Sequence, residues 1–187
     1  RRAEGGRLIT LVHNFDNTSE GHELSPSAAV LDSQSVKTTE KGAQGYDAAK
    51  KVSGRKRHIA VDTLGLIHAL SVHAANVQDR DGAKRVLAQL DWDRYPRLET
   101  IWADAGYQGK LEDWTADELG LWLQIVPKLQ RQQGFVALAK RWIVERTFAW
   151  LGRYRRLSKD YEAEPTSSES WIRCAMIHLM ARRLAPG

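Results

Sequence analysis

The sequence predicts an α/β domain in which a mixed β-sheet carries helices on its faces. Apolar runs with a two-residue period dominate the first half, whereas apolar residues at three- and four-residue steps dominate the second. Two strand-like runs are separated only by turn residues, while later strands are separated by helices, and this combination implies a mixed sheet. We expect a disordered or non-native leader at 1–26 and one folded domain at 27–185.

In the first half, side-chain alternation indicates each strand. The run at 29–36 places Val30 and Asp32 on one face, together with the residues that follow at steps of two. Residues 62–65 supply turn chemistry between two apolar runs and predict an N-proximal β-hairpin. The elements expected here are a strand at 29–36, a polar loop at 37–53, and hairpin strands at 57–61 and 66–72.

In the second half, helical spacing and capping residues define the elements. Asp79 precedes the first helical run, and we expect it to cap the free amides of the first turn. Ser167 or Ser168 is expected to cap the last helix. The expected elements are a helix at 83–90, a strand at 98–103, a helix at 111–119, a strand at 121–126, a long helix at 137–157 and a final helix at 169–184.

Composition bounds the partners and the compartment. The chain has 28 Lys and Arg against 23 Asp and Glu, a net charge of +5 and a pI near 9.4, which is a weak indication of nucleic acid. A single cysteine excludes an intrachain disulfide and favours the cytoplasm. No apolar run approaches the roughly 20 residues that span a bilayer, so no membrane partner is expected. Neither a glycine-rich phosphate loop nor a nucleophile elbow is present, so ATP use and serine-type hydrolysis have no support.

Three acidic residues on separate elements are candidates for chemistry. Asp32 lies inside an apolar strand, Asp104 ends another strand before a tight turn, and Glu145 lies within a helix. Each has a structural alternative: Asp32 as a partner of Lys37, Asp104 as a turn or helix cap, and Glu145 as a surface partner of Arg141. Carboxylates that converge suit hard cations, and two such ions activate an attacking hydroxyl and stabilise the leaving oxygen of a phosphodiester.

Several segments resemble the motifs of bacterial insertion-sequence transposases with a DDE triad. They are LDSQSVKT at 31–38, GRKRHIAVDTLG at 54–65, WADAGY at 102–107, RWIVERTFAWL at 141–151 and RYRRLSKDYE at 153–162. The resemblance runs from about residue 28 to residue 184. It implies a ribonuclease-H-like fold, with Asp32, Asp104 and Glu145 as the catalytic and metal-binding triad. It also implies Mg²⁺ or Mn²⁺ as cofactor, two ions in number, and strand cleavage and transfer at the ends of a mobile element.

The glutamate helix departs from the family pattern at two positions. That pattern places Tyr, Arg, Glu and Lys at fixed steps, and Arg141 and Glu145 fit it. Leu138 stands at the tyrosine position and Gly152 at the lysine position. The role of the lysine then falls to one of the neighbouring arginines at 153, 155 and 156, and the sequence does not choose among them.

Basic residues gather in two clusters that are expected to bind DNA phosphates. One lies in the loop before the hairpin, and the other covers the glutamate helix and its flanks, where residues 131–160 contain eight Lys or Arg and two acids. The alternative for any one of these residues is a solvated surface charge. The DNA-binding candidates are Lys50, Lys51, Arg55, Lys56, Arg57, Arg141, Arg146, Arg153, Arg155, Arg156 and Lys159.

Aromatic and histidine side chains are expected mainly in the interior. Trp142 and Trp150 flank Glu145 and either pack or stack on DNA bases, with packing favoured. The histidines lack zinc-site spacing and are interpreted as sheet residues. The tryptophans expected in the core are Trp92, Trp102, Trp122 and Trp171, and the sheet histidines are His58, His68 and His73.

Two functions from different classes compete at this point. The first is a metal-dependent transposase acting on double-stranded DNA, at transposon ends and target, as a homodimer or larger assembly near the bacterial nucleoid. The second is a truncated or domesticated remnant that binds DNA without catalysis, favoured by the short leader and by a first residue that is Arg rather than Met. A general nuclease on the same fold is a third, which would cut DNA that lacks element ends.

Overall fold

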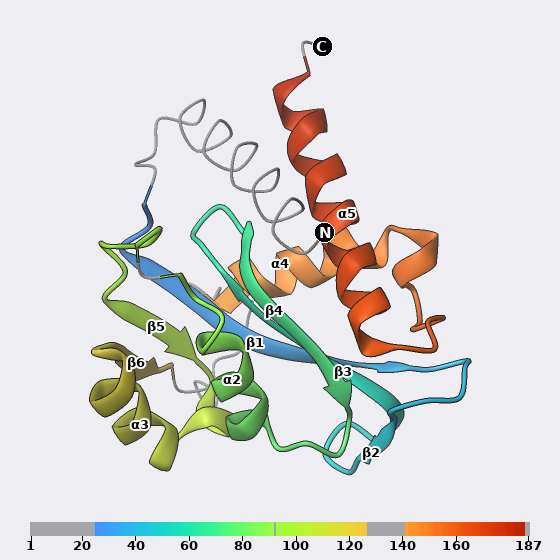
Figure 1. The fold of residues 1–187 in the computed structure, drawn as a ribbon, viewed down its shortest axis with the longest axis horizontal. Helices are drawn as coiled ribbons and strands as arrows, with labels where there is room; N and C mark the ends of the chain where they lie inside the picture. Colours follow the sequence, from blue (N-terminus) through green and yellow to red (C-terminus); the bar gives the residue numbers. More distant parts are fainter. Residues whose placement is uncertain (1–24, 92, 127–140, 186–187) are drawn as a thin grey trace, which may run out of the picture.

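The computed structural model describes residues 25–91, 93–126 and 141–185, and its centre is a six-stranded mixed sheet (Figure 1). The strands are β1 (Ala28–Lys37), β2 (Gly45–Asp47), β3 (Val52–Val61), β4 (Ile67–Ala74), β5 (Thr100–Ala103) and β6 (Trp122–Ile125). β3 runs antiparallel to β1 on one side and to β4 on the other, whereas β5 and β6 continue the sheet parallel to β1. The short β2 extends the β4 side of β3.

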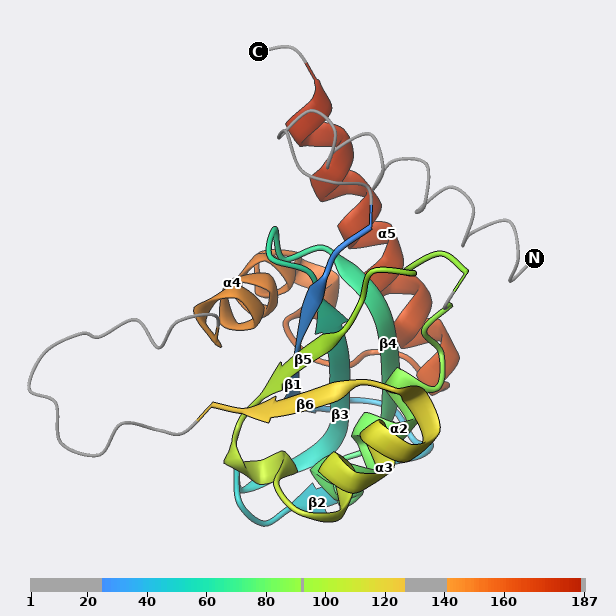
Figure 2. The same ribbon diagram turned by 90° about the vertical axis from the view of Figure 1, so that its left-hand side faces the viewer.

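Helices cover both faces of this sheet. α2 (Asp79–Leu87) and α3 (Lys110–Leu119) pack on one face, and α4 (Arg141–Gly152) and α5 (Pro165–Leu184) pack on the other (Figure 2). Two 3₁₀ turns, η1 (Ala105–Tyr107) and η2 (Arg155–Leu157), follow β5 and α4. Each face has its own apolar cluster, because alternate strand residues point to opposite sides.

The strand order confirms the fold class. Leaving the short β2 aside, the order is β4-β3-β1-β5-β6, with β3 antiparallel to its neighbours and β1, β5 and β6 parallel. This is a ribonuclease-H-like sheet with an N-proximal hairpin, and β3 and β4 form that hairpin. The other half of the sheet consists of the parallel strands β1, β5 and β6, and the connections between them contain helices, as expected for parallel neighbours.

Several element boundaries differ from the sequence-based expectation. The segment predicted as a loop at 37–53 contains β2, and β3 already begins at Val52. α4 ends at Gly152 rather than at 157, because the amides of Arg153 and Tyr154 bond three residues back and tighten the last turn. The leader up to residue 24 and the predicted helical residues 137–140 lie outside the described residues.

The final helix begins earlier than predicted. α5 starts at Pro165 with Glu164 as its N-cap, because proline at the first turn presets a helical φ and lacks the amide that would need a partner. Ser168 therefore lies inside the helix, where its hydroxyl donates to Asp160 instead of capping. The prediction of a Ser167 or Ser168 cap was wrong.

The tryptophan predictions are only partly confirmed. Trp102 is 9% exposed and belongs to the core, as predicted, but Trp122 is 79% exposed and Trp171 is 44% exposed. Trp122 lies on β6, which is paired only with β5 and forms an edge of the sheet. Trp92 lies outside the described residues. None of the helices that the structure describes is long and apolar enough to cross a membrane.

Candidate functional site

The strand register brings Asp32 beside Asp104. β1 and β5 pair in parallel, with Val30 opposite Trp102. Two further steps along each strand lead to Asp32 and to Asp104, and neighbouring strands lie only about 4.8 Å apart. Val30 and Trp102 point into the same apolar cluster, so residues two positions later share that face. The two aspartates predicted from separate motifs are therefore neighbours on the α4 side of the sheet.

Backbone amides orient both carboxylates. The Asp32 Oδ1 atom accepts from the Ser33 amide at 2.7 Å, and the Asp104 Oδ1 atom accepts from the Gly106 amide at 2.8 Å. Asp104 is thus the N-cap of η1, as the structural alternative proposed. One oxygen of this carboxylate caps the turn, and this leaves its position beside Asp32 unchanged.

Tyr107 lies in the electrostatic field of this acidic edge. Its side chain is buried at 1% exposure, beneath the turn that follows Asp104. Burial raises the pKa of Tyr107 well above its ordinary value, and the charges of Asp32, Asp79 and Asp104 raise it further. The negative charges of three carboxylates therefore all reach the Tyr107 hydroxyl, so these acids are grouped around one end of the sheet.

Asp79 is the acidic residue at this edge whose position sequence reasoning missed. It was expected to cap α2, but Gln78 is the N-cap and no side chain caps that helix. The Asp79 Oδ1 atom instead accepts from Lys56 Nζ at 2.9 Å and from Ser33 Oγ at 3.1 Å. A Cβ atom on Gly106 would lie 2.9 Å from Asp104 Oδ1 and 3.5 Å from Asp79 Oδ2, so the two carboxylates reach the same turn.

A signal for this position exists in the sequence. Lys56 and His58 share one face of β3, and Ser33 lies opposite His58 on β1. Ala60, two residues after His58 on the same face, belongs to the apolar cluster on the α2 side, so Lys56 and His58 point to the interior on that side. A buried lysine requires an acidic partner, and the first acid after the hairpin is Asp79.

Lys56 organises the polar cluster behind the acidic edge. Its ammonium group contacts Asp79, the Val77 carbonyl at 3.0 Å and Asp47 Oδ2 at 3.5 Å. Burial raises the pKa of Asp47, but the Ser35 hydroxyl, a backbone amide and nearby lysines outweigh it, so this pKa is lowered overall. Asp47 is therefore charged at neutral pH.

Two buried histidines form the deepest part of the cluster. His58 Nδ1 lies 2.9 Å from His73 Nε2, and His73 Nδ1 lies 3.0 Å from the Ala74 carbonyl. A carbonyl only accepts, so His73 donates from Nδ1, and its neutral form accepts from His58 at Nε2. Burial, and for His58 also His73 and Lys56, lowers the pKa of both rings below the ordinary 6.5. Both histidines are thus neutral sheet residues, as predicted.

The neutral histidine pair predicts acid sensitivity. A folded-state pKa below 6.5 means that the unfolded chain binds more protons at lower pH. Stability is therefore fully present above about pH 6.5 and falls below it, by about 1.4 kcal/mol per pH unit for each histidine that stays unprotonated. Urea unfolding at pH 7, 6 and 5 measures this slope. We expect a shallower slope for His58→Gln; an unchanged slope would exclude His58 as its source.

Glu145 occupies the exposed side of α4. Ile143, Val144, Thr147 and Phe148 are buried against the sheet, whereas Glu145 is exposed. α4 packs on the face of β1 that carries Asp32. Among the described residues, no three His, Cys, Asp or Glu side chains are gathered so that they could hold a metal ion. The triad stays a prediction. The structure brings Asp32 and Asp104 together, but it does not place Glu145 with them in one metal-binding group.

The basic cluster predicted in a loop is partly a buried strand. Arg55, Lys56 and Arg57 lie in β3 and are 0%, 5% and 1% exposed, so the loop placement was wrong. These residues are buried because β3 is a central strand, paired with β1 on one side and with β4 on the other. Carbonyl and carboxylate oxygens inside the protein accept hydrogen bonds from the three cations. Lys50 and Lys51 lie in the turn before β3, and the Lys50 ammonium group donates to the Ser33 carbonyl at 2.8 Å.

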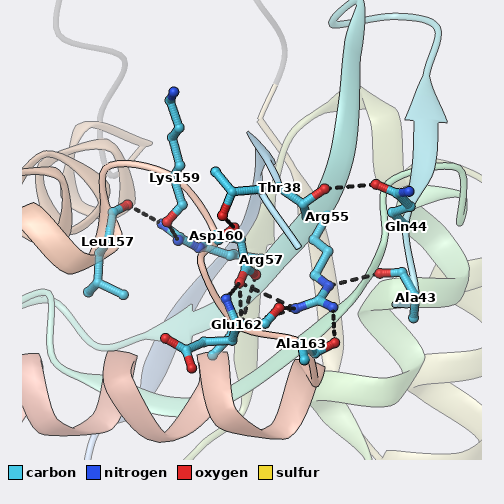
Figure 3. A network of polar contacts seen from close by, with 12 residues as sticks. Thr38, Ala43, Gln44, Arg55, Arg57, Leu157, Lys159, Asp160, Glu162 and Ala163 are labelled. Carbon is cyan, nitrogen blue, oxygen red and sulfur yellow. Dashed lines mark hydrogen bonds and ion pairs between the residues drawn. The ribbon is translucent and has the colours of Figure 1, made fainter. Parts of the chain in front are cut away.

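Arg55 and Arg57 hold the segment after η2 against the sheet (Figure 3). The Arg55 guanidinium donates to the carbonyls of residues 43, 162 and 163 at 2.8, 2.8 and 2.6 Å, and lies 3.3 Å from Asp160 Oδ1. Arg57 donates to the Leu157 carbonyl at 2.8 Å and to the Lys159 carbonyl at 3.0 Å. Burial lowers the pKa of Arg57, and Asp160 opposes that effect.

The second basic cluster is largely exposed. The exposed members that follow α4 are Arg153, Arg155, Arg156 and Lys159. Arg146 is half-buried, between the rings of Trp142 and Trp150 at 4.4 and 4.7 Å from their centroids. The side chain of Arg141, and residues 131 and 140, lie outside the described residues.

Comparison with known proteins supplies the family. The chain matches the Transposase DDE domain family over residues 23–180. It is 28% identical over 139 residues to a putative transposase for insertion sequence element IS402 of Burkholderia cepacia, an alignment that covers 71% of this chain and 64% of that protein. A solved structure of the Mos1 mariner paired end complex with Mn aligns with 96% of this chain and 60% of its own, at 10% identity and a TM-score of 0.44.

The family match spans most of the chain, so this protein belongs to the Transposase DDE domain family. It belongs with the DDE transposases of insertion sequences, as the motif resemblance implied. The aligned part spans less than two thirds of the length of the curated relative.

Proposed function

We propose that this chain carries the catalytic residues of an insertion-sequence transposase, which cleaves DNA strands and transfers them at the ends of the element. The observation that supports the proposal most strongly is the adjacency of Asp32 and Asp104 on parallel strands of a ribonuclease-H-like sheet. Asp104 directly follows the carboxyl end of β5, where open α/β sheets bind ligands, and Asp32 lies beside it within the longer strand β1. Family membership supports the proposed reaction class, and the strand register supports the choice of Asp32 and Asp104.

The donor set at this edge fits hard divalent cations. Asp32 and Asp104 offer carboxylate oxygens, and Asp79 adds negative charge next to them. Glu145 on α4 would complete the set from the helix that packs on the same face. Mg²⁺ or Mn²⁺ held there, as a pair of ions, would supply Lewis-acid activation of the attacking hydroxyl and of the leaving oxygen.

The chain's own groups have distinct tasks in this proposal. The Ser33 and Gly106 amides fix the direction of the two aspartates, which avoids reorganisation on metal binding. The Lys56 ammonium group holds Asp79 beside Asp104 and limits its negative charge. Glu145 is exposed and reaches its position only when α4 and the DNA are correctly placed.

Exposed cations near this edge form the proposed DNA surface. Phosphate contacts from lysine and arginine position a duplex without reading its sequence. Arg55, Lys56 and Arg57 are left out of this surface because they are buried and bonded within the protein. Its exposed members are Lys50, Lys51, Arg153, Arg155, Arg156 and Lys159, and Arg146 is half-buried. Arg141, whose side chain lies outside the described residues, is included from the sequence pattern alone.

The partners that follow are double-stranded DNA, as element ends and as target, and further copies of this chain. Cleaving and joining two ends requires at least two catalytic centres held together, so we propose a homodimer or larger assembly on DNA. A bacterial cytoplasm with nucleoid association is the matching location.

A cleavage assay on DNA that carries the element ends tests this function. We expect nicking or double-strand cleavage at the ends with Mg²⁺ or Mn²⁺, and none with EDTA. DNA lacking the ends is the control, because equal cleavage of both substrates would indicate a general nuclease. DNA binding without metal-dependent cleavage would instead support the non-catalytic alternative.

A further inference from the structure

A positively charged groove between α4 and α5 lies outside the predicted site. It has a volume of about 520 Å³ and lies beyond the Glu145 turn. This volume is within the range of roughly 300 to 1,000 Å³ that is typical of ligand pockets. Arginine side chains dominate its lining, and none of the described lining residues is acidic. Its polar and aromatic members are Trp150, Arg153, Tyr154, His178, Arg182 and Arg183.

A stack of aromatic and guanidinium groups forms one wall. Arg146 lies between Trp142 and Trp150, and the Arg183 guanidinium lies over the Trp150 ring at 4.8 Å from its centroid. Stacking uses the flat faces of a guanidinium and leaves its N–H edge for hydrogen bonds. The indole ring of Trp150 thus links a cation on α4 to a cation on α5 and holds both in fixed orientations.

The two stacked cations repel each other. Burial lowers the pKa of Arg146, and the positive charge of Arg183 lowers it further. Arg153 and Arg182 are exposed and add charge at the same groove. An anion bound beside Arg153, Arg182 and Arg183 would reduce the repulsion among these cations and accept several charge-assisted hydrogen bonds.

The opposite wall is held in place by the Tyr154 hydroxyl. It donates to the Ala175 carbonyl at 3.0 Å, and it therefore accepts from His178 Nδ1 at 2.9 Å. These bonds join the segment after α4 to the middle of α5. The groove is thus a preformed concavity, and its arginines lose less conformational entropy when a ligand binds.

We propose that the α4–α5 groove binds the phosphodiester backbone of duplex DNA, with Arg182 and Arg183 of α5 as phosphate contacts that the sequence analysis did not assign. This inference rests on the proposed function, because it extends the DNA surface around the catalytic residues. Trp150 follows Glu145 by five residues, about 7.5 Å along one helix. The groove therefore begins within two helical turns of Glu145 along the axis of α4, on a different side of the helix.

Salt-dependent binding of a fluorescent duplex to the whole chain tests the groove. Each lost phosphate contact lowers the slope of log K against log salt by about 0.9. We expect Arg182→Ala/Arg183→Ala to bind about 10- to 100-fold more weakly at ~0.1 M salt, with a slope shallower by about 1 to 2. Arg182→Lys/Arg183→Lys keeps the charge and should retain most of the slope.

The matched control removes the same charge from the other face of the sheet. Arg85 on α2 and Lys110 on α3 are both exposed, so Arg85→Ala/Lys110→Ala should bind within about twofold of the wild type. If the wild type and the Arg182→Ala/Arg183→Ala variant bind DNA with equal affinity and an equal salt slope, the proposal that the groove binds DNA is overturned. The proposed function would then remain intact. A wild-type chain that does not bind DNA would overturn both, whereas binding without cleavage would overturn only the catalytic proposal.

Discussion

Replacing Asp104 with asparagine is expected to reduce metal-dependent cleavage of element ends by at least about a hundredfold, with DNA affinity changed less than about twofold. The amide oxygen has the same position as a carboxylate oxygen and can still accept from the Gly106 amide, so the η1 turn is preserved. The neutral amide, however, is a much weaker ligand for a hard dication. Rate loss with a retained fold is therefore the signature of a metal ligand.

The control for this variant is an acid remote from the edge. Asp117 is exposed on α3, so Asp117→Asn should cleave at the wild-type rate. Single-turnover cleavage and anisotropy binding, measured on the same DNA, separate chemistry from affinity. If Asp104→Asn cleaves as fast as the control variant, Asp104 has no part in the reaction.

Asp160→Ala is expected to lower the free energy of unfolding by about 3–5 kcal/mol. Asp160 and Arg55 both have 0% exposed side chains, and the Ser168 hydroxyl also donates to this carboxylate at 2.7 Å. Removing the acid leaves the Arg55 guanidinium charged and buried, which is more costly than the loss of one hydrogen bond. Urea unfolding followed by tryptophan fluorescence measures the change.

An exposed ion pair on the same segment is the control. Arg156 contacts Glu162 at 2.6 Å, but its side chain is 52% exposed, and such pairs contribute about 0–1 kcal/mol. Arg156→Ala should therefore cost no more than ~1 kcal/mol. A similar small loss for Asp160→Ala would show that the network of Arg55 and Asp160 does not hold the segment after η2 to β3.

The sequence predicted the sheet except for β2, and it identified the two acids that the structure places on neighbouring strands. Alternation in 29–36 identified β1, and the position of Asp104 at the end of an apolar run identified the end of β5. Both signals are local, because backbone pleating alone fixes the face of each side chain. The pairing of β1 with β5, which places the two acids side by side, comes from the structure and not from the sequence.

The positions of charged residues were less predictable. Arg55, Lys56 and Arg57 were interpreted as a basic loop, since charged residues are rarely buried without partners. Their partners are Asp79, Asp160 and carbonyls about 100 residues further along the chain or in neighbouring loops. No local pattern contains that information, because it depends on how α5 and the segment after η2 pack on the sheet.

Side-chain environment also explains the errors for Trp122 and Asp79. Trp122 alternates correctly on β6, but none of the strands and helices that the structure describes covers its side of this edge strand, and its side chain is 79% exposed. Asp79 occupies the start of α2, where an acid is favourable, yet the buried Lys56 attracts its carboxylate away from the helix amides. Tertiary charge pairing outweighed the local capping preference in this case.

The most direct test of the catalytic proposal is a crystal structure of the chain bound to Mn²⁺ and an element-end duplex, with the ion located by anomalous scattering. We expect Mn²⁺ with oxygens of both Asp32 and Asp104 in its coordination shell, at about 2–2.6 Å, and Glu145 turned toward the same site. Manganese bound elsewhere, or bound to neither aspartate while DNA occupies the surface, would contradict the shared metal site.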